Sequence, residues 1–358
     1  WASVELLRVV DDKCQKLFDN CFKVLDWPDA PDLTITELDK ELIVYITNPK
    51  TSNNYLEENA EYDNTITQPW PGGDGERSDS LYRFEGYQIF QLANASVTLD
   101  SKDNADLVRL VAQYDIKNGV GPLVNYYYDQ SIEGNVPVVE VEGGDNGIVH
   151  SFSIKEDAFG TTNRQLTNFK QYYYTVVAYA YNQYMPYSQE PAVLNGLYGQ
   201  MEPYLAGRRN IATYTAIPHP TVNGMVLNAE YGQGPQVTRL NGNGNGGMIL
   251  DLTDETIEEI LSKPPADSIN KMGSPDYPIA YEAVYEYGFG PLDVKVIDPL
   301  NVINAKYKLE FTDVKYVFGD SVKIDSAMWV LTNTETGRIY NADKDINLSL
   351  IHIWRCRR

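Results

Sequence analysis

The sequence predicts a mainly β protein: a β-sandwich with long insertions, a second β-rich domain and a short N-terminal helix. Three observations lead to this prediction. Many short runs of β-branched and aromatic residues are bounded by turn residues, few segments show helical periodicity, and strands do not alternate with helices. The length of 358 residues corresponds to about two domains.

The N-terminal segment has the pattern of an amphipathic helix. Apolar residues recur at spacings of three and four from Leu7 to Leu25, with charged residues between them. Cys14 and Cys21 lie on this apolar face, about 10 Å of helical rise apart, which is too far for a disulfide. We expect buried free thiols and assign residues 1–26 to the helical end of a preceding segment.

The first domain is predicted to span residues 27–195. Pro28 and Pro31 end the helix and start an extended segment. Residues 48–80 are polar and are expected to form a long loop, and the turn residues Gly143 to Gly147 predict a hairpin. The strand predictions of this domain are residues 42–47, 81–92 and 171–182, with 106–116 as a strand or a short helix.

The second domain is predicted to span residues 196–347. One helix is expected, at 254–263, and a hairpin is expected at 327–340 with its turn around Glu335 to Gly337. The other strand predictions are two strands around a Gly/Asn loop at 237–252, and residues 281–290, 292–297 and 305–311.

The region from Trp27 onward resembles a fibronectin type III domain with insertions. Leu166 precedes Tyr172 by six residues, and Tyr174, Val176 and Ala178 then alternate with it, as in the sixth strand of that family. The resemblance implies a tyrosine corner, in which the hydroxyl of Tyr172 bonds nearby backbone and Leu166 packs beside it. Another immunoglobulin-like sandwich that shares this corner is the alternative.

Further residues support the resemblance and one departs from it. Phe84, Tyr87 and Ile89 lie where the third strand of a fibronectin type III domain has its core residues. Ile46 takes the place of the usual tryptophan of the second strand, which changes the core packing that the family implies. The insertions would be residues 48–80 and parts of 93–165.

The chain as a whole is also similar to large exported surface proteins of Bacteroidota-type bacteria, some of which are cargo of type IX secretion. The helix–PDAPDLT junction, FEGYQIF and YYYTVVAYAYN carry this similarity. It implies an extracellular or cell-surface location and a role in adhesion or scaffolding.

Composition excludes several classes of partner. The formal net charge is −21, which repels the phosphates of nucleic acids and anionic lipid head groups. No run of about 18 apolar residues predicts a membrane span. The 27 tyrosines fit either half-buried strand positions or a surface that stacks on sugars.

Sequence patterns that would indicate a catalytic or cofactor site are few and nonspecific. Gly242, Gly244 and Gly247 fit G-x-G-x-x-G, but a strand rather than a helix is expected to follow, so a flexible loop is the better interpretation. His150 and His219 have no neighbour at a metal-ligand spacing. Both are interpreted as structural or surface residues.

Calcium is the best ligand hypothesis, because it binds clustered oxygen ligands in loops. Glu57, Glu58, Glu61 and Asp63 form one candidate group, and a second group is the pair Asp145 and Asn146. Solvated loops with no bound ion are the alternative interpretation.

The sequence therefore predicts a non-enzymatic structural or adhesion module of a multidomain exported protein, with surface glycans or proteins as partners. One alternative is a carbohydrate-binding accessory module of a secreted glycoside hydrolase. A weaker alternative is an enzyme with a pair of carboxylates in the second domain.

The last eleven residues, 348–358, read LSLIHIWRCRR and differ in character from the acidic chain before them. They resemble the conceptual translation of a transposase-based sequencing adapter with one TGA codon read as tryptophan. We expect an artefactual tail and a second domain truncated near Asn347. Without the three arginines the formal charge falls from −21 to −24.

Overall fold

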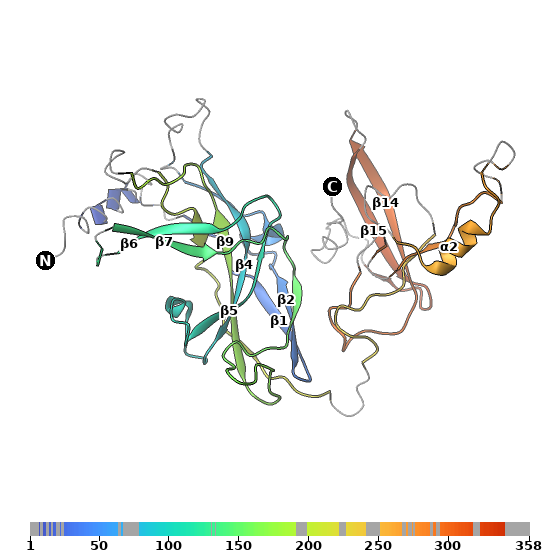
Figure 1. Ribbon diagram of the computed structural model, residues 1–358, viewed down its shortest axis with the longest axis horizontal. Helices are drawn as coiled ribbons and strands as arrows, with labels where there is room; N and C mark the ends of the chain where they lie inside the picture. Colours follow the sequence, from blue (N-terminus) through green and yellow to red (C-terminus); the bar gives the residue numbers. More distant parts are fainter. Residues whose placement is uncertain are drawn as a thin grey trace. The chain divides into compact units, whose positions relative to one another are not determined.

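The computed structural model divides into two compact units, Trp1–Thr221 and Val222–Arg358 (Figure 1). The structure describes residues 25–63, 66, 79–129, 131–132, 134–190, 199–221, 227–240, 251–266, 270, 274, 276–286, 289–290, 294–317 and 323–340, with scattered positions between 7 and 22. The fold is mainly β, with several antiparallel sheets and one short helix, α2, whose bounds are described. None of the helices among the described residues has the length and apolar character to cross a membrane.

The described residues from Leu7 to Phe18 are helical, in agreement with the periodicity of this segment. Cys14 is a free cysteine and is exposed, so the expected burial of this thiol is wrong. The reason is that described residues of the predicted apolar face are themselves exposed: Leu7 and Val10 are 68% and 50% accessible. Cys21 lies outside the described residues.

The first sheet of unit 1 has three antiparallel strands in the order β1-β2-β8. β1 (Asp32–Leu38) and β2 (Glu41–Thr47) form a hairpin, and β8 (Ser151–Ile154) pairs with the other edge of β2. Leu42, Val44 and Ile46 alternate along β2 and are fully buried, as the pattern of this strand predicts.

The second sheet of unit 1 has six strands around β4 and β9. β4 pairs with β9, β5 and β3, while β10 and β11 both pair with β9. The bounds of these strands are β3 Ala60–Tyr62, β4 Leu81–Leu92, β5 Val108–Asp115, β9 Tyr172–Tyr181, β10 Tyr204–Ala206 and β11 Tyr214–Ala216. The segment that the sequence left open between strand and helix is thus strand β5.

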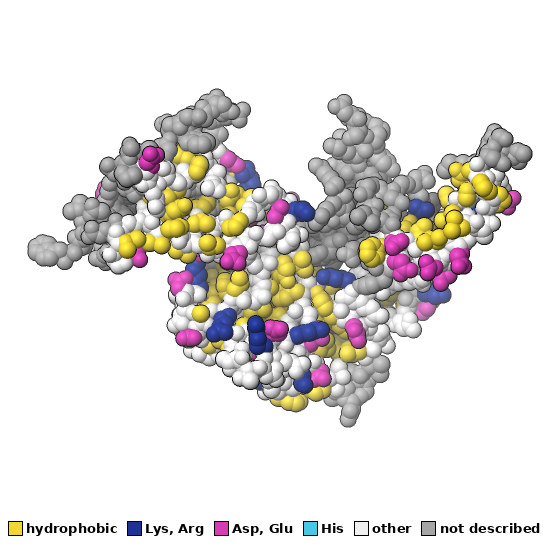
Figure 2. All heavy atoms as spheres, viewed as in Figure 1, with side chains coloured by type: hydrophobic (Ala, Val, Ile, Leu, Met, Phe, Trp, Pro, Cys, Tyr) yellow, Lys and Arg dark blue, Asp and Glu magenta, His cyan; other side chains and the backbone are white. Residues whose placement is uncertain are grey.

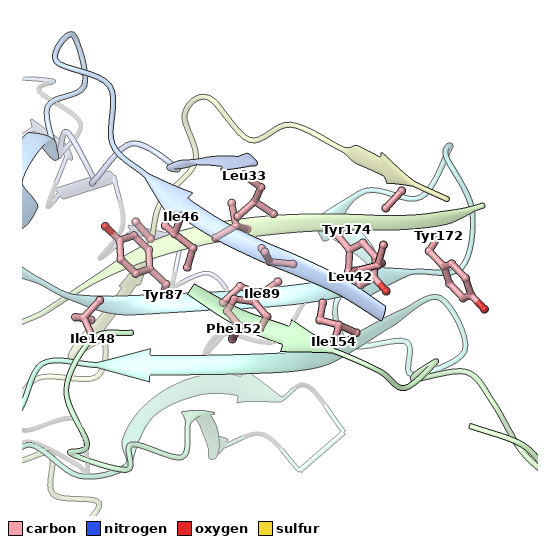
Figure 3. Close-up of a cluster of buried hydrophobic side chains, with 14 of the residues drawn as sticks. Leu33, Leu42, Ile46, Tyr87, Ile89, Ile148, Phe152, Ile154, Tyr172 and Tyr174 are labelled. Atoms are coloured by element: carbon pink, nitrogen blue, oxygen red, sulfur yellow. The ribbon is translucent and has the colours of Figure 1, made fainter. Parts of the chain in front are cut away.

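The two sheets pack face to face on the main hydrophobic core. Figure 3 shows Leu42 and Ile46 of the first sheet directed toward Ile89 and Tyr174 of the second. Ile46, which stands where the resemblance expects tryptophan, is fully buried in this core. The burial of apolar side chains from both sheets is the dominant stabilising contribution in such an arrangement.

A two-stranded ribbon covers the outer face of the second sheet. Strand β6 (Leu123–Asp129) pairs with β7 (Gly134–Val141), and Leu123 and Val141 bury against Tyr179 and Tyr204. Unit 1 therefore has a second, smaller core on the side of β4 and β9 that faces away from the main core.

The hairpin predicted around Gly143 to Gly147 is wrong. β7, before this segment, pairs with β6, whereas β8, after it, pairs with β2 in the other sheet. The turn residues serve a connection between layers instead: Asp145 and Gly147 both have positive φ. The partner of β7 is β6, a strand that the sequence did not predict.

Residues 48–80, predicted as a loop, include short elements within the described part. A 3-10 helix, η1, spans Tyr55–Glu57, and β3 adds to the edge of β4. A second 3-10 helix, η2 (Leu99–Ser101), lies between β4 and β5.

The predicted domain boundary after residue 195 precedes two strands that pair with β9. Tyr204 of β10 is buried on Tyr179, and Ala216 of β11 is fully buried in the main core. The division into compact units falls later, between Thr221 and Val222.

Unit 2 contains two small sheets and helix α2 (Asp254–Leu261), the helix predicted there. β14 (Tyr307–Val317) and β15 (Lys323–Asn333) form a long hairpin, and β16 (Ile339–Tyr340) adds to β15 through a turn at residues 334–337, as predicted. β12 (Thr238–Arg239) pairs with β13 (Ala283–Val284).

Two details of unit 2 differ from expectation or lie beyond the described residues. Residues 294–297 belong to no strand, although Val296 exchanges backbone hydrogen bonds with Gly232 and Gln233. The glycines at 242, 244 and 247 and the tail 348–358 lie outside the described residues. Acidic side chains gather along α2 in Figure 2, where Asp254, Glu255, Glu258 and Glu259 are exposed.

Candidate functional site

Glu57, a predicted calcium ligand, lies in a buried polar network at one end of the main core. Its Oε1 is 2.5 Å from Nε2 of His150 and accepts a hydrogen bond from the hydroxyl of Tyr87 at 3.1 Å. The amide of Asn48 donates in turn to the Tyr87 hydroxyl at 2.5 Å. The side chains of His150 and Glu57 are 1% and 6% exposed, so their contact is almost closed to bulk solvent.

This network joins the two sheets and the insertion of unit 1. Asn48 and His150 flank β2 and β8 of the first sheet, and Tyr87 belongs to β4 of the second. Glu57 ends η1 in the insertion. Leu56 and Glu57 have φ values of 64° and 62°, a left-handed conformation that is uncommon for residues other than glycine. Burial and the nearby Glu57 raise the pKa of Tyr87 well above its ordinary value. The network holds the insertion against both sheets.

The other three residues of the first predicted group lie elsewhere. Glu58 is exposed and Glu61 lies in β3. Asp63 lies close enough to Tyr82 and Tyr184 to raise the pKa of both hydroxyls, although burial is the larger cause. In the described part of the chain no three or more His, Cys, Asp or Glu side chains form a group that could hold a metal ion.

The second predicted group, Asp145 and Asn146, lies in a reciprocal arrangement with Asp115. The carboxylate of Asp145 accepts the N–H groups of Asn118 and Gly119 at 2.7 and 2.9 Å. The carboxylate of Asp115 accepts the N–H groups of Asp145 and Asn146 at 2.9 and 3.4 Å. Each carboxylate thus fixes the loop that carries the other, which is a structural use of both groups.

Glu85 lies beside this pair and is buried, with 4% of its surface exposed. The amide of Asn118 donates to both of its carboxylate oxygens, at 3.0 and 2.9 Å. Burial, followed by the charges of Asp115 and Asp145, raises the pKa of Glu85 to about 7, and the Asn118 bond opposes this rise. A buried carboxyl group that titrates near neutral pH is a mark of candidate functional sites.

A pocket of about 490 Å³ opens between β5, β7 and the loop after β7. This volume is within the range of small-ligand sites, which is about 300–1,000 Å³. The pocket combines acidic and amide side chains with two apolar ones, and its lining residues are Leu110, Gln113, Asp115, Val139, Glu140, Glu142, Gly144 and Asn146. We call it the acidic pocket.

The two residues predicted to form a tyrosine corner lie together. The hydroxyl of Tyr172 accepts the N–H of Thr167 at 2.9 Å. Leu166 and Tyr172 are 1% and 2% exposed and share the main core. Tyr172 is the first residue of β9, so these contacts lie at the entry into that strand.

A second surface lies on the β14–β15 hairpin. Tyr307, Leu309 and Phe311 alternate along β14 and share one face, with Trp329 directly opposite Phe311. Tyr307 and Phe311 are 42% and 40% exposed. This face, which we call the aromatic face, therefore presents aromatic rings to solvent.

Sequence reasoning named Asp145 and Asn146 but not Asp115, Glu85 or Glu140. A signal for Asp115 was present: the stretch DIKNG places a carboxylate directly before turn residues at the end of a strand. Glu85 and Glu140 carry no such signal, because each is one acid within a strand and only the packing of the β6–β7 ribbon brings them near the pocket.

No protein-family model matches this sequence, and neither a curated protein nor a solved structure gives a significant match.

Proposed function

We propose that unit 1 is a fibronectin type III-like module and that the chain is a non-enzymatic adhesion and structural module of an exported, cell-surface protein. The order of strands supports this proposal. A three-stranded sheet, β1-β2-β8, faces a sheet in which β5, β4, β9 and the pair β10/β11 follow one another. This order resembles that of a seven-strand immunoglobulin-like sandwich, in which two antiparallel sheets pack face to face.

The buried polar groups also favour a binding module over an enzyme. His150 and Glu57 are enclosed by protein, and the carboxylates of Asp115 and Asp145 accept hydrogen bonds from backbone N–H groups. These groups stabilise loops, and rigid loops on a sandwich are a common platform for recognition.

Retention of beads coated with the full chain tests the proposal. The beads are exposed to surfaces that carry purified extracellular proteins or a panel of glycans, and the surfaces are then analysed by mass spectrometry. We expect retention on protein surfaces with no chemical change of either surface. Cleavage products would contradict a non-enzymatic role, and the absence of retention on every surface would contradict adhesion.

The aromatic face favours one alternative, a carbohydrate-binding accessory module. Exposed rings on a flat strand surface stack on the apolar faces of sugars, and Tyr307 and Phe311 are placed for such stacking. Retention on glycans alone, lost in Phe311→Ala and kept in Phe169→Ala, would support this alternative. Phe169 is the matched control because it is 77% exposed and lies in unit 1.

A further inference from the structure

Two loops of unit 1, residues 117–121 and 143–147, are joined through carboxylate groups. The carboxylate of Asp145 in the second loop accepts the N–H group of Asn118 in the first, at 2.7 Å. The side chain of Asn118 donates in turn to both carboxylate oxygens of Glu85 on β4, at 3.0 and 2.9 Å. Both loops are therefore linked to β4 through one buried acid, and we call this arrangement the carboxylate latch.

Asp115, at the end of β5, attaches the second loop to the sheet. Its carboxylate accepts the N–H group of Asp145 at 2.9 Å, and the residue is 4% exposed. A Cβ atom at Gly143 would lie 3.1 Å from Oδ2 of Asp115 and would collide with the carbonyl oxygen of Gly121. The two loops thus contact each other directly, backbone against backbone, beside a buried carboxylate.

The backbone of both loops adopts left-handed conformations. Asp145 has a φ of 48°, which is uncommon for residues other than glycine, while Gly119 and Gly147 have φ values of 87° and 95°. The hydrogen bonds that the carboxylates accept offset the strain at Asp145. A change that weakens these bonds therefore favours separation of the loops before any strand is disturbed.

A buried tyrosine beneath the latch lacks a hydrogen bond. Tyr179 is fully buried, and its hydroxyl has no hydrogen-bond partner among the described residues. Burial, followed by the charges of Asp115 and Glu85, raises the pKa of this hydroxyl, which places it near both carboxylates. Val120 of the first loop packs on the cluster that contains Tyr179. The closed latch therefore has an energetic cost that is relieved when the loop lifts and water reaches the hydroxyl.

The ionisable groups that face Glu85 are all acids or tyrosines. Asp115 faces it from β5, Asp145 from the second loop, and Tyr179 and Tyr181 from β9. Burial, followed by the charges of Asp115 and Asp145, raises the pKa of Glu85 to about 7. Among the described residues no lysine, arginine or histidine acts on this pKa, so no cation balances the charge of an ionised Glu85.

We infer that the carboxylate latch is controlled by a proton: a proton on Glu85 keeps the two loops closed, and its release lets them open while the sandwich stays folded. Ionisation adds a third negative charge beside Asp115 and Asp145, and separation of the loops relieves the repulsion. Gly144 and Asn146 of the second loop line the acidic pocket, so opening would also change the shape of that pocket. The inference goes beyond the proposed adhesion role and does not depend on it.

Proton linkage gives the sign and size of the effect. A pKa that is raised in the closed state favours that state at low pH, and this contribution is lost as pH rises through 7. With a pKa of about 7 in the closed latch and the ordinary value of 4.5 in the open one, the equilibrium constant for opening should rise about tenfold between pH 6 and pH 8.

Hydrogen–deuterium exchange of the full chain, followed by mass spectrometry, tests the inference. Labelling times are scaled for the intrinsic pH dependence of amide exchange, so that only opening is compared. Peptides that cover the two loops should exchange about tenfold faster at pH 8 than at pH 6, and at both pH values faster than peptides from β9. Glu85→Gln should abolish the pH dependence of the loops, because glutamine stays neutral. Asp145→Asn, which keeps an acceptor oxygen and removes one charge, should make it smaller.

Glu58→Gln is the matched control, because Glu58 is exposed and lies outside the latch, and it should keep the tenfold change. Loop exchange that does not depend on pH in the unsubstituted chain, or a pH dependence that survives in Glu85→Gln, would overturn the inference. One common rate for the loops and β9 would overturn it as well, because it would report global unfolding. If Glu85→Gln does not fold, an undiminished pH dependence in Asp145→Asn is the contradicting result.

Discussion

Several buried polar residues in unit 1 lie where their replacement or ionisation should lower the free energy of unfolding. His150 and Glu57 form a contact that is almost closed to solvent, and Glu85 is a buried carboxyl group between two other acids. The stability of the folded state depends on the partners of such groups. A buried polar atom that loses its hydrogen bonds to water and makes none within the protein destabilises the fold.

Replacing His150 by alanine should lower the free energy of unfolding by about 3 kcal/mol, because it leaves a cavity and removes the closest partner of Glu57. Urea unfolding followed by tryptophan fluorescence measures this loss. His219→Ala is the control, since His219 is half-exposed and its ring lies 3.6 Å from Glu37. Equal losses for the two variants would show that the buried network contributes little.

Glu85 should make stability fall as pH rises through the range from about 4.5 to 7. Its pKa in the folded state, about 7, is above the ordinary value of 4.5, so the folded state keeps a proton that the unfolded state has released. The contribution is therefore most favourable below pH 4.5 and is lost on ionisation near pH 7.

Glu85→Gln should remove this dependence, because glutamine stays neutral. We expect its melting temperature to exceed that of the unsubstituted chain at pH 8 and to equal it at pH 4.5. The exposed Glu58→Gln variant should show no such crossover. A parallel pH profile for Glu85→Gln and the unsubstituted chain would contradict the raised pKa.

At the scale of elements, the contact between β4, β5 and β9 depends on the absence of one side chain. Gly86 pairs with Asp115 of β5 and Tyr179 of β9. A Cβ atom at Gly86 would collide with the carbonyl oxygen of Tyr114 and would lie 2.6 Å from the Tyr179 hydroxyl. The buried ring of Tyr179 occupies the space that any other residue would need, and Tyr204 packs on this ring at 5.4 Å between centroids.

Gly86→Ala should therefore lower the free energy of unfolding by about 2–3 kcal/mol, the usual cost of overpacking. Chemical denaturation measures this cost. Gly134→Ala is the matched control, because a Cβ atom there has its nearest neighbour at 3.7 Å and the change should be within about 1 kcal/mol. A Gly86→Ala variant as stable as Gly134→Ala would mean that both the Tyr114 backbone and the Tyr179 ring move away at little cost.

At the scale of the whole molecule, the two compact units set which segments must stay together. β10 and β11 follow β9 after a gap in sequence and still pair with it, so the sandwich is completed only near residue 216. A fragment that ends at the sequence-predicted boundary would leave one edge of β9 unpaired and would expose Tyr179 on the outer face.

A fragment of residues 27–221 should unfold cooperatively, whereas a fragment of residues 27–195 should be strongly destabilised or unfolded. Thermal melts and the dispersion of amide proton resonances distinguish these outcomes, with the full chain as the reference. Equal stability of the two fragments would contradict the assignment of β10 and β11 to the core of unit 1.

Part of the candidate site was readable from sequence. The acids near Gly143 to Gly147 were singled out because turn residues with oxygen side chains are visible as a local pattern. Asp115 and Glu140 were not, because each comes from a different strand and the pocket exists only where β5 and β7 meet. The role of Glu57 was also hidden, since its partner His150 is distant in sequence.

The sequence by itself determined the mainly β class, the long strands β4 and β9, helix α2 and the turn before β16. These are local properties, set by alternation, β-branching and turn chemistry within short windows. Tertiary structure alone decided that β7 pairs with β6 and β8 with β2, that β10 and β11 complete the sandwich, and that scattered acids line one pocket. Strand pairing and side-chain convergence depend on contacts between distant segments, whose energies no local pattern encodes.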